Sequence, residues 1–470
     1  MAFLFNEHFR STARITYLNQ FWLGQIVFND SLSDWSSYTY HRGREYYPKF
    51  PVILQSDGLP WDIANAYLVR LAELKNPWEI ESINTRAKGL LAYLRFLEDE
   101  KLDFLHLPTN HRLKAPYRFR SKLNELIHKG LSISYASSCI RAVIDFYKNI
   151  VRWELISQDS FSNVPYQKIE VFINYMNNYG FSRIKKVETS DISIKTPKSQ
   201  LPCDHIRDGG SLRPLSVIEQ QKLKAIVDSP DSNTALSLMI KISVTTGGRL
   251  QTICTLRNYH IDYLYEQLQS NQCSDRKDRS VELSTGMFRD IDTKNGVIQT
   301  LHFHPQLIEE LAVYSLSEQH RKRMAHSYYG ESRNNYLFLT RDGHPFYTSR
   351  HEMLARQAQE SDQTNVIQRF PIKTGGAVET LFKRLVLELQ KNHPEVNYFR
   401  FHDLRATFGM NLVRSLSAAG LSGLMLLMTV RDRMGHSDIA VTQRYLDFDE
   451  VLHDMNAITD TYEHHLFGGA

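Results

Sequence analysis

Two short segments near the C-terminal end of the chain combine residue types that suit phosphate chemistry. His402 and Arg405 are three residues apart, so a helix would project both side chains from one face toward one ligand. Further on, Gly435 predicts a turn, His436 follows it, and Tyr445 comes nine residues after that histidine. We therefore predict a site that binds a phosphate, with Tyr445 as the candidate nucleophile.

Two cations farther upstream are candidates for the same site. Arg249 follows two glycines, which allow a tight turn and would place it at the start of a new helix, pointing into a groove. Lys294 precedes Asn-Gly, a hairpin-turn signal, and lies between the strand-like segments 280–283 and 287–291 and the alternating segment 297–303. We therefore expect Lys294 at the tip of a β-hairpin.

In order and spacing, these residues resemble the signature of the tyrosine recombinases, the phage integrase family. The shared features are an arginine after a glycine turn, a lysine in a hairpin, HxxR, Met-Gly-His, and a tyrosine nine residues later. The resemblance covers about residues 213–450 by motif. It implies six catalytic residues: Arg249, Lys294, His402, Arg405, His436 and Tyr445. It also implies a mainly α-helical fold with a small antiparallel β-hairpin sheet, in which a helical N-terminal core-binding domain precedes a tyrosine-recombinase-like catalytic domain.

The implied activity is site-specific DNA recombination through a 3′-phosphotyrosine intermediate, performed by a tetramer on two duplexes. Charge develops on the phosphate during attack, and Arg249 and Arg405 could each offer a planar fork of donors to its non-bridging oxygens. The phenol of a free tyrosine has a pKa of roughly 10, so Tyr445 needs a base or a positive field before it can attack.

The remaining three residues receive their roles from the same resemblance. His402 would accept the tyrosine proton, His436 would bind the scissile phosphate, and Lys294 would protonate the departing 5′ oxygen. This chemistry requires no metal and no cofactor.

One position departs from the family pattern. The residue three after Arg249 is commonly acidic in the family, but it is Thr252 in this chain. The usual carboxylate that braces the arginine is therefore missing, and a replacement would have to come from elsewhere in the chain. The stretch from Lys294 to His402 is also longer than the family pattern leads us to expect, which indicates an insertion.

Local patterns predict the helices that would position these residues. Ser216 and Glu219 form a capping box, which predicts a helix from Ser216 to about Val227. A second helix over about 235–244 would lead to the glycine turn, and a third over 377–390 has apolar residues on one face. Upstream, helical periodicity predicts a four-helix domain between Trp61 and Trp153.

These patterns divide the chain into four parts: 1–59, of unknown role; 60–180, a helical core-binding domain; 181–212, a basic linker; and 213–470, the catalytic domain with its tail. Residues 1–59 could contact DNA or cover the next domain. The linker could follow phosphates or be only a solvated tether. The tail from Asp449 could pack on a neighbouring subunit or on its own domain.

A helical domain before the catalytic domain resembles the part of the family that grips the duplex. We therefore expect DNA contacts from basic residues there and in the linker, although scattered Lys and Arg can also be only solvated charge. The expected contacts are Arg86, Lys88, Arg118, Arg120, Lys122, Arg141, Lys185 and Lys186.

Composition bounds the class of protein. A length of 470 residues exceeds what one core usually supports, so roughly two or three domains are expected. A net charge of +4 permits a nucleic-acid partner without requiring one. The four cysteines lack CxxC pairing, which argues against a disulfide framework and a zinc site.

The sequence has neither a long uncharged apolar run nor a signal-peptide layout. We expect a cytoplasmic protein without a membrane partner, nucleoid-associated when it is bound to double-stranded DNA. Two alternatives to recombination remain: a type IB topoisomerase-like enzyme that rejoins the same strand, and a DNA-binding protein whose site is idle.

Overall fold

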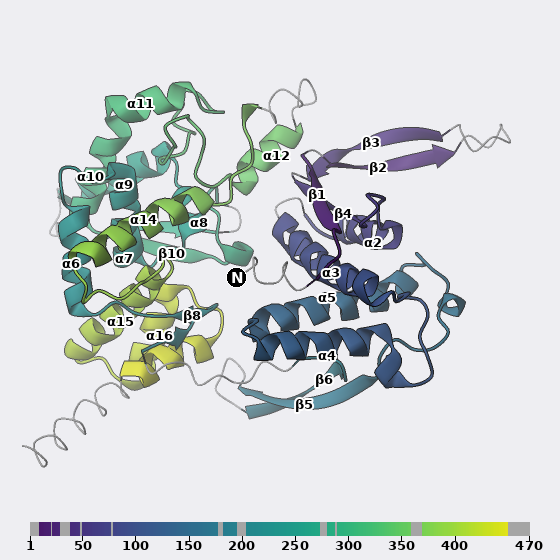
Figure 1. The fold of residues 1–470 in the computed structure, drawn as a ribbon. Coiled ribbons are helices and arrows are strands. Elements are labelled where there is room, and N and C mark those ends of the chain that lie inside the picture. Colours follow the sequence, from purple (N-terminus) through teal and green to yellow (C-terminus); the bar gives the residue numbers. More distant parts are fainter. Residues whose placement is uncertain are drawn as a thin grey trace, which may run out of the picture. The chain divides into compact units, whose positions relative to one another are not determined.

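The structure of the protein is a computed structural model. It describes residues 9–19, 21–28, 38–47, 49–76, 79–176, 182–194, 204–272, 280–286, 289–358 and 369–449. It forms two compact units (Figure 1). The first consists mainly of residues 1–175 and 182–199, and the second mainly of 200–356 and 361–470.

The first unit begins with two antiparallel strand pairs. Strand β1 (Arg14–Leu18) pairs with β4 (Phe50–Leu54), and β2 (Phe21–Phe28) pairs with β3 (Tyr38–Tyr47). Phe50 and Ile53 of β4 are buried, so this strand belongs to the core of the unit.

Four long helices follow these strands, as the periodicity predicts. They are α2 (Asp62–Glu73), α3 (Ile80–Glu100), α4 (Ala115–His128) and α5 (Ile133–Arg152). Helices α3 and α4 both pack against α5, and the three lie side by side in Figure 1. Leu90, Phe119 and Phe146 fill the space between them and are fully buried.

The prediction of a linker over 181–212 is wrong for the first part of that range. Strand β6 (Ser182–Ser190) pairs with β5 (Lys168–Met176) and extends the first unit. Lys186 bonds to Glu170 at 2.7 Å, an ion pair that joins the two strands. A two-stranded ribbon exposed to solvent carries mostly polar side chains. The composition of β6 therefore resembles that of a flexible linker, although the segment is a strand.

The second unit is mainly helical. Its helices include α6 (Val217–Val227), α7 (Thr234–Thr246), α8 (Leu250–Cys254), α9 (Asn258–Gln272), α10 (Pro305–Leu316), α11 (Glu318–Ala325), α12 (Arg350–Ala358), α14 (Gly376–Asn392), α15 (Asp403–Ala418) and α16 (Gly423–Met434), and a further helix covers 439–449. Helix α7 contacts α8, α10, α14 and α15, so it lies at the centre of the unit. The mainly α fold with small antiparallel sheets is therefore confirmed.

Three predicted helices of this unit are present. The side chain of Ser216 accepts from the backbone N–H of Glu219, and the Glu219 side chain accepts from that of Ser216, which completes the capping box at the start of α6. Helix α7 ends at Gly247 in a left-handed conformation (φ +69°) that suits glycine. Val378 and Phe382 of α14 are buried in the main core of the unit.

The hairpin expected around Lys294 has a different shape. Strand β9 (Val281–Thr285) pairs directly with β10 (Gln299–Phe303), and a connection over 286–298 joins them. Lys294 lies in this connection, in a 3-10 turn, and not at a two-residue hairpin tip. The connection is held to the domain because the buried Asp292 accepts from the backbone N–H of Arg350 at 2.9 Å.

The longer stretch between β10 and α15 contains α10, α11, α12 and α14. Between α11 and α12 the chain forms isolated β-bridges, such as the one between Arg257 and Tyr336. Residues 359–368 of the expected insertion and 450–470 of the tail lie outside the described residues. Within the part of the chain that the structure describes, every helix is too short or too polar to cross a membrane.

Candidate active site

Helix α15 places two of the predicted residues. His402 occupies the position just before the helix, and Arg405 lies in its first turn. Arg405 is fully buried, and its guanidinium donates to the carbonyl oxygens of Gly247 at 2.6 Å and Met434 at 2.5 Å. These carbonyls stand at the C-terminal ends of α7 and α16, where helices carry partial negative charge. Arg405 therefore links three helices.

Arg249 lies where the glycine turn predicts it, immediately before α8. Burial and then the like charge of Arg405 lower the pKa of Arg249 to about 10. Two positive guanidinium groups in one buried region repel each other, and a bound anion relieves that repulsion. The site is therefore electrostatically prepared for a negatively charged group.

The turn at Gly435 (φ +61°) ends α16 and presents His436. The Nδ1 atom of His436 lies 3.0 Å from Oγ1 of Thr442, and the ring centre lies 5.7 Å from that of Tyr445. Tyr445 belongs to a helix over 439–449 and is fully buried. A Cβ atom on Gly409 of α15 would come within 2.5 Å of Cε1 of Tyr445, so glycine there allows the ring to approach the helix.

Asp208 is a residue of this site that the sequence did not reveal. Its Oδ2 atom contacts Arg405 Nε at 3.3 Å, His436 Nε2 at 3.2 Å and the hydroxyl of Tyr445 at 3.1 Å. Asp208 lies between two short antiparallel strands, β7 (Ile206–Arg207) and β8 (Ser211–Leu212). The contacts of this one oxygen bring three of the six predicted residues together.

The close contacts around Asp208 shift the pKa values of Asp208 and Tyr445. Burial acts to raise the pKa of the Asp208 carboxyl, but the hydrogen bond from His436 and the charge of Arg405 outweigh it and hold the pKa well below its ordinary value. Burial and then the Asp208 charge raise the pKa of Tyr445 well above that of free tyrosine. In this arrangement the carboxylate is ionised and the phenol keeps its proton.

Both predicted histidines are neutral near pH 7. Burial and then the charge of Arg405 lower the pKa of His402 to about 4. Burial also lowers the pKa of His436, against the opposite effect of Asp208. In neutral His436, Nε2 donates to the carboxylate, so Nδ1 is left to accept from the Thr442 hydroxyl.

Lys294 stands apart from these direct contacts. Its side chain is exposed, and it lines a pocket of about 640 Å³ together with Arg249 and His402. The Nζ atom lies 3.6 Å from the place where a Cβ on Gly209 would be, which puts it beside the Asp208 segment. The structure thus brings Lys294 to the edge of the site.

The basic residues expected to contact DNA are largely paired with carboxylates. Arg86 bonds to Asp145 at 2.5 Å, and Arg118 pairs with Glu100. The remaining pairs are Lys88 with Glu81 at 3.6 Å, Lys122 with Glu125 at 3.7 Å, and Lys186 with Glu170. Arg141 donates to Ser137 and is exposed, Arg120 is half-buried, and the Lys185 side chain lies outside the described residues. Their role in DNA binding stays a prediction.

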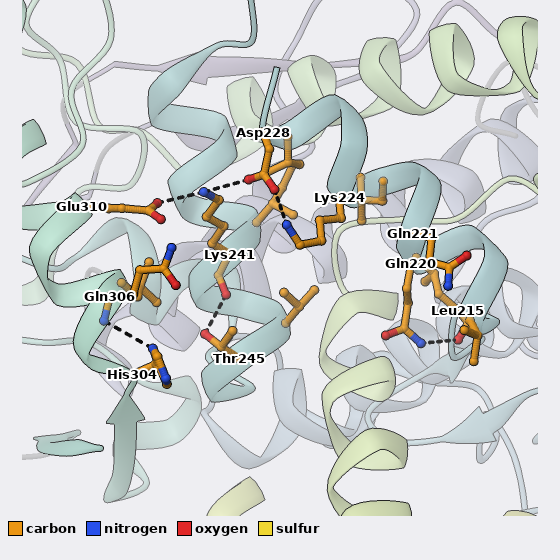
Figure 2. A pocket seen from close by; sticks show the side chains of 16 residues that line it. Leu215, Gln220, Gln221, Lys224, Asp228, Lys241, Thr245, His304, Gln306 and Glu310 are labelled. Carbon is orange, nitrogen blue, oxygen red and sulfur yellow. Dashed lines mark hydrogen bonds and ion pairs between the residues drawn. The ribbon is translucent and has the colours of Figure 1, made fainter. Parts of the chain in front are cut away.

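A second pocket, of about 590 Å³, lies between α6, α7 and the start of α10. Lys241 bonds to Asp228 at 2.9 Å and to Glu310 at 2.8 Å along its wall (Figure 2). Its lining, in the described part of the chain, includes none of the six predicted site residues. The candidate active site is therefore distinct from this pocket.

The second unit is a mainly helical domain in which one arginine, one histidine and one tyrosine meet at a single anionic oxygen, and this arrangement suits the tyrosine-type DNA strand-transferring enzymes. The model of the phage integrase family matches residues 216–450, half of the chain. The chain therefore belongs to the phage integrase family, the tyrosine recombinases.

Solved structures with similar folds include three integrases or recombinases bound to DNA. The Tn1549 transposon integrase with transposon right end DNA is 15% identical, with 84% of this chain and 98% of that chain covered and a TM-score of 0.44. The XerH recombinase bound to difH is 15% identical, with 78% and 77% covered and a TM-score of 0.43. A lambda integrase dimer bound to a COC' core site is 14% identical, with 82% and 94% covered and a TM-score of 0.42. No curated protein matches the sequence.

Proposed function

We propose that the protein is a site-specific DNA recombinase that cuts and rejoins DNA through a 3′-phosphotyrosine intermediate. One observation carries this proposal: Arg405, His436 and the Tyr445 hydroxyl converge on a single anionic oxygen, that of Asp208. Groups that hold one oxygen of a carboxylate beside a tyrosine hydroxyl can hold one oxygen of a phosphodiester in the same way.

In the proposed mechanism, Tyr445 attacks the phosphorus while Arg249 and Arg405 bind the non-bridging oxygens. The two positive charges offset the negative charge that develops as the phosphorus becomes five-coordinate. Neutral His436 donates a hydrogen bond to the same phosphate. The two arginines also provide the positive field that the buried phenol needs in order to lose its proton.

Proton transfers complete the reaction. His402 is neutral at working pH because of its lowered pKa of about 4, so it is free to accept the proton of Tyr445. Lys294 donates a proton to the 5′ oxygen as that oxygen leaves. The phosphotyrosine bond keeps the energy of the original phosphodiester, and attack by a free 5′ hydroxyl reverses every step without metal or cofactor.

We propose further that four copies of the chain act on two double-stranded DNAs in the cytoplasm, exchanging one pair of strands and then the other. The helical first unit would hold the duplex through its basic residues, and the C-terminal tail would contact its own domain or a neighbouring copy. Ion pairs such as that between Arg86 and Asp145 would have to open for these side chains to reach phosphates.

Covalent trapping tests the proposed function. The probe is a nicked duplex that carries the DNA sequence flanking the gene, because the nick lets the cut segment diffuse away and leaves the protein attached. Attachment at a 3′ phosphate supports strand transfer, whereas binding without attachment indicates an idle site. Exchange between two duplexes indicates a recombinase, and loss of supercoils from one duplex indicates a type IB topoisomerase-like enzyme.

A substrate with a better leaving group tests the role of Lys294 as the general acid. Lys294→Ala is expected to cleave normal DNA roughly 10² to 10⁴ times more slowly, which is the usual span for general acid catalysis. Sulfur in place of the bridging 5′ oxygen departs readily as an anion and needs no acid. Cleavage of this substrate by Lys294→Ala, followed as adduct formation over time, is therefore expected to return close to the parent rate.

Arg405→Ala serves as the comparison, since its defect would lie at the non-bridging oxygens and sulfur should not repair it. If Lys294→Ala stays equally slow on the sulfur substrate, Lys294 is not the acid. His402 would then be the first residue to test in that role.

A further inference from the structure

The Asp208 carboxylate occupies the point at which the proposed function requires a phosphate oxygen. A single oxygen, Oδ2, receives Arg405 Nε, His436 Nε2 and the Tyr445 hydroxyl within 3.1 to 3.3 Å. A phosphodiester oxygen needs Arg405 and His436 as donors in the same place, and the phosphorus beside it needs the Tyr445 oxygen free to attack. The carboxylate and the phosphate therefore cannot use these donors at once.

The same segment closes the site to a large substrate. Arg405 and Tyr445 are fully buried, and Asp208 is only 4% exposed. A DNA backbone cannot touch groups that have no accessible surface. Some part of the protein has to move before strand cleavage can begin, and the Asp208 segment already holds the position that the phosphate would take.

The segment is anchored on both sides of Asp208. Ile206 and Leu212 are buried in the cluster that also contains Met434 and Tyr445. The backbone oxygen of Arg207 accepts from Nη1 of Arg444 at 2.8 Å, and that of Ser211 accepts from Arg400. Gly209, with φ +65°, forms the turn between the strands. The carboxylate is thus carried by a small hairpin with its own anchors.

A catalytic role for this carboxylate conflicts with its environment. As a base it would be weaker than His402, because His436 and Arg405 hold its pKa well below the ordinary value of a carboxyl. Its charge also raises the pKa of Tyr445, which opposes formation of the nucleophile. Next to a bound phosphodiester it would add repulsion between two anions at short distance.

We propose that the hairpin over 206–212 is an autoinhibitory plug, in which Asp208 imitates the scissile phosphate and must withdraw before DNA can bind to the catalytic groups. The inference rests on the proposed function for the identity of the displaced ligand. The DNA-free protein then holds its nucleophile buried and protonated. Productive DNA binding exchanges one anion for another and leaves the two arginines neutralised throughout.

The first test asks whether a free anion can enter the site, with inorganic phosphate as the probe and sodium chloride at equal ionic strength as the reference. Asp208→Asn keeps the shape of the side chain and removes its charge. Phosphate is expected to raise the melting temperature of Asp208→Asn by about 2–4 °C and to leave that of the parent unchanged. Asp204→Asn is the matched control, because it makes the same change just before the hairpin, where Asp204 pairs only with the neighbouring His205 in the described contacts.

Two results would overturn the plug: equal stabilisation of the parent and of Asp208→Asn by phosphate, and no stabilisation of either. Arg444→Ala is the second variant in case Asp208→Asn fails to fold. It removes an anchor of the hairpin and keeps the carboxylate, so phosphate should stabilise it more than the parent. A response of Arg444→Ala equal to that of the parent would count against the proposal.

The second test measures covalent attachment to the nicked duplex. If the open form is about one tenth of the DNA-free protein, Asp208→Asn should form adduct up to about tenfold faster at limiting DNA, and Asp204→Asn should match the parent. A slower rate for Asp208→Asn would instead make Asp208 a positioning residue and reject the plug. Absence of adduct from every protein, together with selective stabilisation of Asp208→Asn by phosphate, would reject strand transfer and leave the plug standing.

Discussion

Tyr445→Phe is expected to bind DNA as tightly as the parent and to form no covalent adduct. The substitution removes the phenol oxygen alone, and this oxygen is the proposed nucleophile. The ring would keep its place against Gly409, because the close approach there involves ring carbon Cε1 and not the hydroxyl. Adduct formation on the nicked duplex, resolved as a slower band on a denaturing gel, measures the effect.

The cost of this substitution to folding should be small. The Tyr445 hydroxyl makes one of the three contacts to Asp208 Oδ2, and Arg405 and His436 still satisfy the carboxylate. Loss of one hydrogen bond of this kind costs about 0.5–1.5 kcal/mol of unfolding free energy. Tyr263→Phe, at an exposed position on α9, is the matched control and should keep full activity. Adduct formed by Tyr445→Phe would show that another residue is the nucleophile.

The sequence alone was sufficient to predict the positions of those residues that depend on local backbone geometry. Gly247 and Gly435 end helices in the left-handed conformation, and each turn delivers the next predicted residue, Arg249 or His436. The capping box at Ser216 likewise depends on four adjacent residues. Short-range rules of this kind do not need the tertiary structure.

Asp208 could not be predicted because its partners are far away along the chain. It is separated by 197 residues from Arg405 and by 237 from Tyr445. Asp-Gly-Gly signals a turn, and the sequence says nothing of what a turn packs against. Asp208 does not replace the acid missing at Thr252, because its described hydrogen bonds run to Arg405, His436 and Tyr445 and not to Arg249.

The prediction that Lys294 lies at a hairpin tip was wrong for a related reason. Asn-Gly is a strong hairpin signal, but β9 and β10 pair across a connection over 286–298. Burial of Asp292 against the backbone of Arg350 stabilises this connection, and that contact spans 58 residues. Tertiary contacts therefore overrode a local turn preference.

Arg249→Ala and Arg405→Ala are each expected to reduce cleavage by about 10²-fold or more, because each removes one cation from the developing charge. Most DNA affinity should remain, since many backbone contacts supply it. Rates of adduct formation at saturating DNA, with affinity measured separately, provide the comparison. Arg414→Ala, on the same helix as Arg405 and paired with Asp449 at 3.0 Å, is the control that should cleave normally.

The two variants should differ in stability, which separates their roles. Arg405→Ala leaves the carbonyls of Gly247 and Met434 without their buried donor, and it also leaves Asp208 with less positive charge. Unpaired buried groups of this kind cost about 1–3 kcal/mol each, so the melting temperature should fall clearly. Burial and then the charge of Arg405 lower the pKa of Arg249 to about 10, so Arg249→Ala removes a buried cation and relieves a repulsion. Its melting temperature should therefore stay close to that of the parent.

Arg405→Lys then separates charge from geometry. A lysine keeps the positive charge, but a single ammonium group cannot reach the ends of α7 and α16 and a phosphate oxygen as the planar guanidinium does. If charge alone mattered, this variant would cleave almost as fast as the parent. We expect it to remain about as slow as Arg405→Ala, because the same fork of donors both joins the helices and aims at the phosphate. Parallel loss of binding and cleavage in the Arg249 and Arg405 variants would contradict this, since the arginines would then anchor DNA and not stabilise the transition state.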